Sequence, residues 1–228
     1  MLVLGIDDAG RGPLIGPMIL AGVLWNGEIE RKLLNEGIKD SKMLEHRERI
    51  RLSGLIKGKA ISYKIVRAMP HEIDETENLN TLEAMKMAEV INGLNIGKVK
   101  DEKIKVIVDC PSVNTKSWSE TLKSFVQHKD NLDILCEHKA DVNHVSVGAA
   151  SILAKVQREE EVSKIKKEYG EIGSGYPSDP MTKEFLAKRG KELKDSGIFR
   201  KSWSTWKKMF PGEGQMTLER FYSSQIPP

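Results

Sequence analysis

Short apolar runs alternate with stretches of helical periodicity along most of this chain. Runs rich in branched apolar residues predict strands at 2–8, 16–25, 59–67, 104–108 and 132–137. Helices are predicted, mainly from apolar residues at helical spacing, near 28–35, 45–56, 80–91, 116–127, 143–169 and 181–195. The Gly16-Pro17 connection predicts a hairpin between the first two strands. Strands come first, strands and helices then alternate, and helices follow, so we expect an α/β fold with a mixed sheet.

The first predicted strand ends in two adjacent carboxylates, Asp7 and Asp8, and the turn Gly10-Arg11-Gly12 follows. Because successive strand residues point to opposite faces, only one of the two carboxylates can easily point into the protein. Mg²⁺ or Mn²⁺ would relieve the repulsion between them, since both ions take carboxylate oxygens. Glycine lets the backbone approach a ligand closely, and arginine offers a planar fork to phosphate. The pattern therefore predicts metal-assisted chemistry on a phosphodiester.

Two further acids stand at comparable places in the predicted fold. Asp109 ends the central strand 104–108, and Asp141 comes just before the long helix. Functional sites of α/β sheets collect at strand ends and helix N-termini, so we expect Asp7, Asp8, Asp109 and Asp141 to converge on one cleft. For Asp141 alone, a helix cap or a turn residue in solvent is an equally good interpretation.

Composition narrows the class of protein without naming it. A chain of 228 residues with 39% hydrophobic content predicts one large domain, or one domain with a modest appendage. The net charge of +3 is too small to indicate nucleic-acid binding by itself, but it leaves room for a locally basic face. Cys110 and Cys136 lack the spacing of zinc ligands and are expected to be reduced thiols. No apolar stretch could cross a bilayer and no signal-peptide pattern opens the chain, so we expect a cytoplasmic protein without membrane contact.

Several motifs of the chain resemble the type 2 ribonucleases H, in the expected order and over nearly its whole length. These motifs are Gly5-Ile-Asp-Asp-Ala-Gly-Arg-Gly-Pro13, Asp40-Ser-Lys42, Val108-Asp-Cys-Pro111, His138-Lys-Ala-Asp141 and Ala149-Ala-Ser-Ile-Leu-Ala-Lys-Val156. The segments Gly173-Ser-Gly-Tyr-Pro-Ser-Asp-Pro180 and Arg200-Lys-Ser-Trp203 resemble the archaeal branch. The resemblance implies a ribonuclease H-like mixed sheet flanked by helices over 1–170, a helical region over 171–210 that completes the substrate-binding face, and a tail over 211–228.

The resemblance also implies an activity. It predicts an endonuclease that hydrolyses the RNA strand of RNA/DNA hybrids and cuts 5′ of ribonucleotides embedded in duplex DNA, leaving a 5′-phosphate and a 3′-hydroxyl. The family's catalytic and metal-binding acids carry over to Asp7, Asp8, Asp109 and Asp141, which would hold two Mg²⁺ or Mn²⁺ ions. The family usually has glutamate where Asp8 stands. Either the site closes by a small backbone shift, or the chain is a weaker enzyme or a variant.

Two other interpretations stay open. The first is a DNA-repair or recombination nuclease, which also uses clustered carboxylates. The second belongs to a different class: a hybrid-binding module whose catalysis is weakened by Asp8. The Gly-Arg-Gly turn and Tyr176 favour ribose recognition over the first of these, and four retained acids count against the second.

By resemblance, the backbone of Gly10-Arg11-Gly12 and the side chain of Tyr176 together recognise the ribose 2′-hydroxyl, which distinguishes RNA from DNA. Phosphate contacts are expected from basic residues inside the motifs, namely Arg11, Lys42, Lys139 and Lys155. Arg200 with Trp203 would extend a basic, aromatic face along the duplex. The alternatives are solvated surface lysines and a loop tyrosine. For the tryptophans, helix packing in the C-terminal part is the favoured role. His138 and His144 are more often structural than catalytic, with His144 the candidate for proton transfer.

The end of the chain matches the peptide that binds sliding clamps. Gln215 would hydrogen-bond beside an apolar pocket, which Leu218, Phe221 and Tyr222 would enter from one face of a helical turn. The alternative is that these aromatic residues fold back onto the domain. The expected partners are therefore RNA/DNA hybrid, ribonucleotide-containing duplex DNA and a sliding clamp, and we expect the protein to be a monomer.

Overall fold

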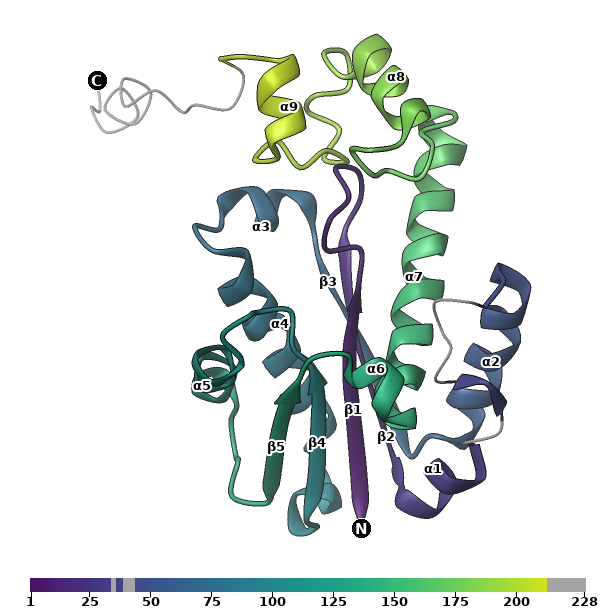
Figure 1. The fold of residues 1–228 in the computed structure, drawn as a ribbon, viewed down its shortest axis with the longest axis vertical. Helices are drawn as coiled ribbons and strands as arrows, with labels where there is room; N and C mark the ends of the chain where they lie inside the picture. Colours follow the sequence, from purple (N-terminus) through teal and green to yellow (C-terminus); the bar gives the residue numbers. More distant parts are fainter. Residues whose placement is uncertain (34–35, 39–43, 213–228) are drawn as a thin grey trace.

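The computed structural model describes residues 1–33, 36–38 and 44–212, and a mixed sheet forms its centre (Figure 1). The five strands lie in the order β3-β2-β1-β4-β5. Their bounds are β1 Leu2–Ala9, β2 Met18–Asn26, β3 Ser62–Ala68, β4 Ile104–Asp109 and β5 Leu132–Glu137. Strand β1 pairs antiparallel with β2 and parallel with β4, and β5 continues the parallel side. The predicted α/β class, the mixed sheet and the first hairpin are confirmed.

The helices agree with the predicted positions apart from their ends. Their bounds are α1 Gly27–Leu33, α2 His46–Lys59, α3 Pro70–Glu75, α4 Leu79–Leu94, a 3-10 turn at Gly97–Asp101, α5 Thr115–Phe125, α6 Ala140–Asn143, α7 Val145–Tyr169, α8 Pro180–Arg189 and α9 Ser204–Met209. Helices α3, α6 and α9 and the 3-10 turn were not predicted as separate elements. The expected helix 143–169 begins at Val145, because His144 is extended and separates it from the short α6. The expected third strand begins at Ser62, because α2 continues to Lys59.

Helices cover both faces of the sheet. Helices α4 and α5 pack on one face, and α1, α2 and α7 pack on the other (Figure 1). Helix α7 lies close against β1 at Gly5, where a β-carbon would lie 2.1 Å from the backbone of Ser146. Only glycine permits this approach, so Gly5 lets the N-terminal part of α7 lie directly against β1.

Side-chain alternation along β1 sends its two terminal acids to different faces. Leu4 and Ile6 belong to the core beneath α4, whereas Val3 belongs to the core beneath α7. Asp7 therefore faces α7 and Asp8 faces α4. Asp7 is 5% exposed and Asp8 is partly exposed, which agrees with the expectation that one of the two enters the protein more deeply.

The C-terminal region forms a third apolar cluster at one end of the long axis (Figure 1). Leu14 and Ile15, from the connection between β1 and β2, join Phe199, Trp206 and Phe210 in this cluster. The ring centroids of Phe199 and Trp206 lie 5.0 Å apart, so Trp206 has the packing role favoured for the tryptophans. The division at 170 and 210 stays a prediction.

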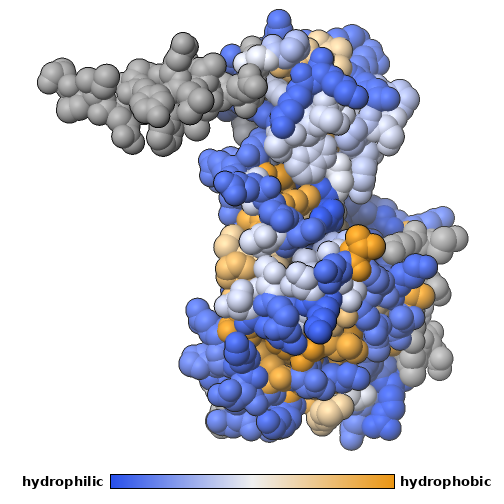
Figure 2. Space-filling model, turned by 60° about the vertical axis from the view of Figure 1, so that its left-hand side comes forward, coloured by the Kyte–Doolittle hydropathy of each residue, from blue (hydrophilic) through white to orange (hydrophobic). Residues whose placement is uncertain are grey.

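The surface is largely hydrophilic on the side that Figure 2 shows, with smaller apolar patches between hydrophilic residues. Among the helices within 1–33, 36–38 and 44–212, none is both long and apolar enough to cross a membrane.

Candidate active site

Two of the predicted acids, Asp7 and Asp109, meet where the neighbouring parallel strands β1 and β4 end. Ile6 of β1 pairs with Val108 of β4. Asp7 and Asp109 are the next residues on these two parallel strands and therefore lie side by side. The backbone N–H of Ala140 donates to Asp109 Oδ1 at 2.7 Å, which ties the turn before Asp141 to the end of β4. Asp141 is 2% exposed. The structure thus brings Asp7 and Asp109 together and fixes the backbone that carries Asp141 beside them.

Burial and neighbouring negative charges raise the pKa values of two of these acids, Asp7 and Asp8. Burial, then the charges of Asp8 and Asp109, raises the pKa of Asp7 well above 3.8. Ser151 of α7 donates its hydroxyl to Asp7 and lowers the same pKa in part. Burial, then the charge of Glu83, likewise raises the pKa of Asp8. A divalent cation would relieve this repulsion.

The donor set fits a hard cation, because it consists of carboxylate oxygens. Within the described part of the chain, however, no three or more His, Cys, Asp or Glu side chains are already arranged to hold an ion. Binding of Mg²⁺ or Mn²⁺ at Asp7, Asp8, Asp109 and Asp141 would therefore require these side chains to close in around the ion.

Glu83 of α4 is a member of this site that the sequence analysis missed. Its residue exposure is 0%, and its Oε2 accepts from Arg11 Nε at 2.8 Å. Arg11 Nη2 also donates to Asn80 Oδ1 at 2.6 Å. Glu83 lies among the core-facing residues of α4, one helical turn before the buried Met87. A charged residue at a core position of a predicted helix was the signal that could have identified it.

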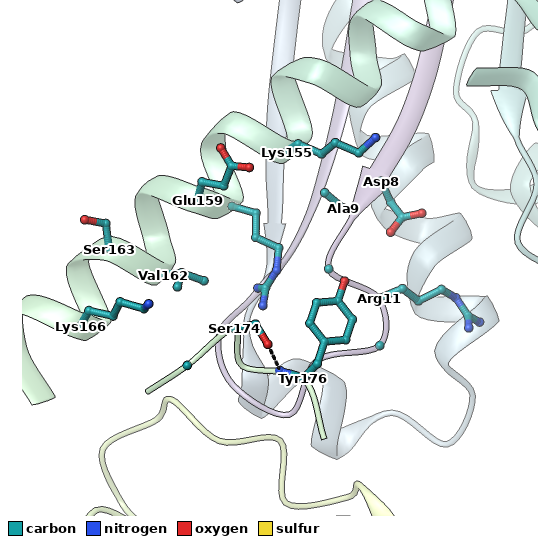
Figure 3. A pocket seen from close by; sticks show the side chains of 14 residues that line it. Asp8, Ala9, Arg11, Lys155, Glu159, Val162, Ser163, Lys166, Ser174 and Tyr176 are labelled. Carbon is teal, nitrogen blue, oxygen red and sulfur yellow. Dashed lines mark hydrogen bonds between the residues drawn. The ribbon is translucent and has the colours of Figure 1, made fainter. Parts of the chain in front are cut away.

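The Gly-Arg-Gly turn borders a groove of about 670 Å³. The turn with Asp8 forms one wall, the α7 face from Lys155 to Lys166 forms another, and the loop with Tyr176 closes it (Figure 3). A β-carbon on Gly12 would lie 3.6 Å from Tyr176 Cε1, so the tyrosine ring reaches the turn. Arg11 is directed away from Tyr176, towards α4. Among the expected substrate residues, the turn, Lys155 and Tyr176 share this groove.

Arg200 holds the turn from inside the protein. Its guanidinium donates to the carbonyls of Gly10 at 2.7 Å, Arg11 at 2.8 Å and Gly16 at 3.0 Å. Arg200 is 0% exposed, and burial lowers its pKa to about 9, which leaves it charged at neutral pH. A buried guanidinium with these partners cannot lie on a phosphate-binding surface. The expected place of Arg200 on a basic, aromatic face along the duplex is therefore corrected to a positioning role.

Trp203 joins Arg200 in holding the turn. Its Nε1 donates to the carbonyl oxygen of Gly12 at 2.9 Å, and the Arg200 guanidinium lies 5.1 Å from its ring centroid. Asp74, at α3, accepts from the backbone N–H of both Lys201 and Ser202 at 2.8 Å. The segment after Phe199 is thereby attached to the turn on one side and to α3 on the other.

The loop that carries Tyr176 is ordered by Asp179. The Asp179 carboxylate accepts from the backbone N–H and the hydroxyl of Ser174, both at 2.6 Å, and from Met181 N at 2.9 Å. These bonds, led by the Ser174 hydroxyl, lower the pKa of Asp179 to about 2, so it is ionised at neutral pH. The backbone N–H of Leu14 donates to the Gly175 carbonyl at 2.8 Å. Tyr176 is thus held on a loop bonded to the connection between β1 and β2.

The remaining candidate residues lie away from the groove or outside the residues that the structure describes. Lys139 is exposed and left-handed, with φ 58°, in the turn before α6, and it does not line the groove. His138 Nδ1 lies 3.0 Å from the Cys110 carbonyl, and His144 Nε2 lies 2.8 Å from Glu137 Oε1. Both histidines thus have structural partners. Residues outside the described ranges are Lys42, Gln215, Leu218, Phe221 and Tyr222.

Comparison with known proteins decides the family. The model of the family described as Ribonuclease HII matches residues 4–206. This chain belongs to the ribonuclease HII family. It is therefore a type 2 ribonuclease H, a nuclease among the metal-dependent hydrolases, as the motifs predicted.

Relatives of this family match the chain almost end to end. A ribonuclease HII of Pyrococcus furiosus is 40% identical, over 97% of this chain and 99% of the relative. The crystal structure of the ribonuclease H2 from Pyrococcus horikoshii OT3 has a TM-score of 0.82 and 38% identity, over 92% of this chain and 97% of that one. The ribonuclease HII in the PCNA:RNase HII complex from Archaeoglobus fulgidus has a TM-score of 0.77 and 33% identity, over 90% and 96%. The ribonuclease H-like fold is confirmed.

Proposed function

We propose that this protein is an endonuclease that hydrolyses the RNA strand of RNA/DNA hybrids and cuts 5′ of ribonucleotides embedded in duplex DNA, leaving a 5′-phosphate and a 3′-hydroxyl. The observation that carries the proposal is the position of Tyr176 against the Gly-Arg-Gly turn, in the groove that Asp8 borders. A sugar beside Asp8 would meet glycine backbone and a tyrosine hydroxyl together. These groups can hydrogen-bond a 2′-hydroxyl, which deoxyribose lacks.

In this proposal Asp7, Asp8, Asp109 and Asp141 hold two divalent ions, in keeping with the metal dependence of the family. Bound ions of this kind activate a water molecule and stabilise the leaving 3′-oxygen. The protein's own groups orient the acids: the Ser151 hydroxyl bonds to Asp7, and the Ala140 N–H bonds to Asp109. Arg200 and Trp203 keep the carbonyls of the turn directed inwards, which leaves its outer edge for the sugar.

Comparing two matched duplexes tests the substrate class. One duplex is all DNA, and the other carries a single ribonucleotide at a known position. We expect cleavage of the second only, with the new 3′-hydroxyl on the nucleotide before the ribonucleotide. Equal cleavage of both would favour the DNA-repair or recombination nuclease. Binding of hybrid without cleavage, with activity restored by Asp8→Glu, would favour the catalytically weakened binding module.

Replacing Tyr176 by phenylalanine is expected to lower kcat/KM at a single ribonucleotide by about tenfold to a hundredfold, because a hydrogen bond to the 2′-hydroxyl is lost while the ring stays. Tyr63→Phe is the matched control, since Tyr63 is 43% exposed and Tyr176 is 44% exposed, but Tyr63 lies on β3 and does not line the groove. The control should cleave at the native rate. Unchanged kinetics in Tyr176→Phe would remove Tyr176 from ribose recognition.

We further propose that the tail binds a sliding clamp through Gln215, Leu218, Phe221 and Tyr222. The spacing of these residues supports this partner, as does the Archaeoglobus fulgidus relative, which is described in complex with PCNA. Deleting residues 215–228 should abolish binding to the clamp in a pull-down or calorimetric titration and leave hydrolysis of a short hybrid unchanged. Clamp binding that survives the deletion would refute this role of the tail.

A further inference from the structure

Glu83 places a carboxylate oxygen inside the protein without a donor. The Oε2 atom is bonded to Arg11, whereas Oε1 is buried and has no hydrogen-bond partner within the described ranges. A buried carboxylate oxygen that lacks a partner destabilises the fold, because nothing in the protein replaces the water that solvates it in the unfolded chain. A bound ion is one group that can satisfy such an oxygen.

The nearest acid to Glu83 is Asp8. Asp8 projects from β1 towards the face that α4 covers, and its carboxyl group lies close enough to that of Glu83 for a hydrogen bond when one of the two is protonated. Two carboxyl groups at such a distance need either a shared proton or a cation between them. The fully buried position of Glu83 prevents its side chain from escaping to solvent. A cation that enters beside Asp8 therefore meets Glu83 as well.

Glu83 also compensates the positive charge of Arg11 beside the metal site. The positive charge of Arg11 lies near enough to Asp8 to influence it, and such a charge would repel a divalent ion. The ion pair at 2.8 Å between Arg11 and Glu83 compensates this charge. One oxygen of Glu83 is thus occupied by Arg11, and the other remains for an ion.

We propose that Glu83 is a fifth acidic residue of the metal site, whose Oε1 shares with Asp8 the ligation of one divalent ion. Glu83 approaches from α4 and supplies the reach that aspartate at position 8 lacks, since glutamate is longer by one methylene group. The inference rests on the proposed function, which places the ions at the four aspartates. The ligand is Mg²⁺ or Mn²⁺, as expected for an all-oxygen set.

Titration of Mn²⁺ into the full-length protein tests this inference without using activity. Free Mn²⁺ is followed by electron paramagnetic resonance, in the native protein and in Glu83→Gln. The substitution keeps the shape of the side chain and its hydrogen bond to Arg11 through the amide oxygen, but it removes the charge. We expect Mn²⁺ affinity to fall by about tenfold or more. Unchanged affinity would overturn the proposal.

Arg11→Gln distinguishes ligation from a merely structural ion pair. If Glu83 served only to neutralise Arg11, both substitutions would remove the same charge–charge interaction and would change Mn²⁺ affinity alike. The proposal predicts opposite results: weaker binding in Glu83→Gln, and equal or tighter binding in Arg11→Gln, because a repelling cation is gone. Changes of the same sign and size would contradict it. Thermal unfolding in EDTA checks that both variants are folded.

A rescue experiment tests whether Glu83 compensates for the shorter side chain of Asp8. In the double variant Asp8→Glu with Glu83→Gln, the longer side chain at position 8 should restore most of the Mn²⁺ affinity that Glu83→Gln loses. An affinity no better than that of Glu83→Gln would count against the proposal, and this arm remains informative if the single variant is unstable.

Asp8→Asn distinguishes a failure of the four-aspartate metal site from a failure of Glu83 as its fifth acid. If Asp8→Asn binds Mn²⁺ as tightly as the native protein, the proposed metal site itself is wrong. If Asp8→Asn weakens binding and Glu83→Gln does not, the four-aspartate site stands and only the fifth acid is refuted.

Discussion

Replacing Asp7 by asparagine is expected to lower the rate of hybrid cleavage by at least about a thousandfold, which corresponds to roughly 4 kcal/mol of transition-state stabilisation. Asp7 is the most enclosed acid of β1, at 5% exposure, and it lies between Asp8, Asp109 and the hydroxyl of Ser151. An amide in its place offers one neutral oxygen where a metal site needs a charged carboxylate. Single-turnover cleavage of a hybrid in saturating Mg²⁺ measures the effect.

The matched control for this variant is Asp133→Asn. Asp133 is also on a strand, β5, but it is exposed and pairs with Lys105 near the start of β4, whereas Asp109 stands at the other end of that strand. The control should cleave at the native rate. If Asp7→Asn keeps more than about a tenth of the native rate, Asp7 does not hold a catalytic ion.

Stability shows whether the loss in Asp7→Asn is chemical or structural. Burial and neighbouring charges raise the pKa of Asp7 above 3.8, so the folded protein binds a proton that the unfolded chain releases. This carboxyl therefore stabilises the metal-free fold at low pH relative to high pH, and the contribution is lost as pH rises through the raised pKa. In EDTA at neutral pH, Asp7→Asn should be at least as stable as the native protein. A strong loss of stability there would show that Asp7 serves the fold.

Replacing Arg200 by methionine is expected to destabilise the protein by about 3–5 kcal/mol. The substitution removes the three hydrogen bonds to the carbonyls of Gly10, Arg11 and Gly16, and these acceptors lie in the interior beneath the turn. Each acceptor left without a donor costs about 1–3 kcal/mol. Unfolding in guanidinium chloride measures the loss, and cleavage at a single ribonucleotide should fall with it, because the turn borders the groove.

Two controls separate the geometry of Arg200 from its charge. Arg189→Met removes a partly exposed arginine at the end of α8, which pairs with Glu192 and reaches the Tyr169 carbonyl only at 3.5 Å, and it should cost less than about 1 kcal/mol. Arg200→Lys keeps the charge but cannot present three planar donors, so it should be nearly as destabilised as Arg200→Met. If Arg200→Met is as stable as the control Arg189→Met, Arg200 does not position the turn.

Short apolar runs made most of the strands of the sheet and part of the site predictable from the sequence. The runs that end in Asp7 and Asp109 carry their own strand signal, and parallel pairing of β1 with β4 brings those ends together. Helix α3 escaped prediction because it has six residues and begins at Pro70, which leaves too little chain for an apolar period. Element ends that depend on a single backbone conformation, such as the extended His144, were also missed.

Contacts between distant segments could not be predicted from local pattern. Arg200 and the Gly10 carbonyl are 190 positions apart, and only the folded chain shows that the guanidinium is enclosed. In the sequence, Arg200 beside Trp203 has the appearance of a basic, aromatic surface. Glu83 is the converse case, because its place on the core-facing side of α4 was visible in the spacing, whereas its partners Arg11 and Asp8 were not.

The most direct test of the account is single-turnover cleavage of a duplex that carries one ribonucleotide, first in EDTA and then with Mg²⁺ or Mn²⁺ restored. We predict no product in EDTA, and with metal a single cut 5′ of the ribonucleotide that leaves a 3′-hydroxyl and a 5′-phosphate. Full cleavage in EDTA, or a cut elsewhere, would contradict a ribonucleotide-recognising metal site at the ends of β1 and β4.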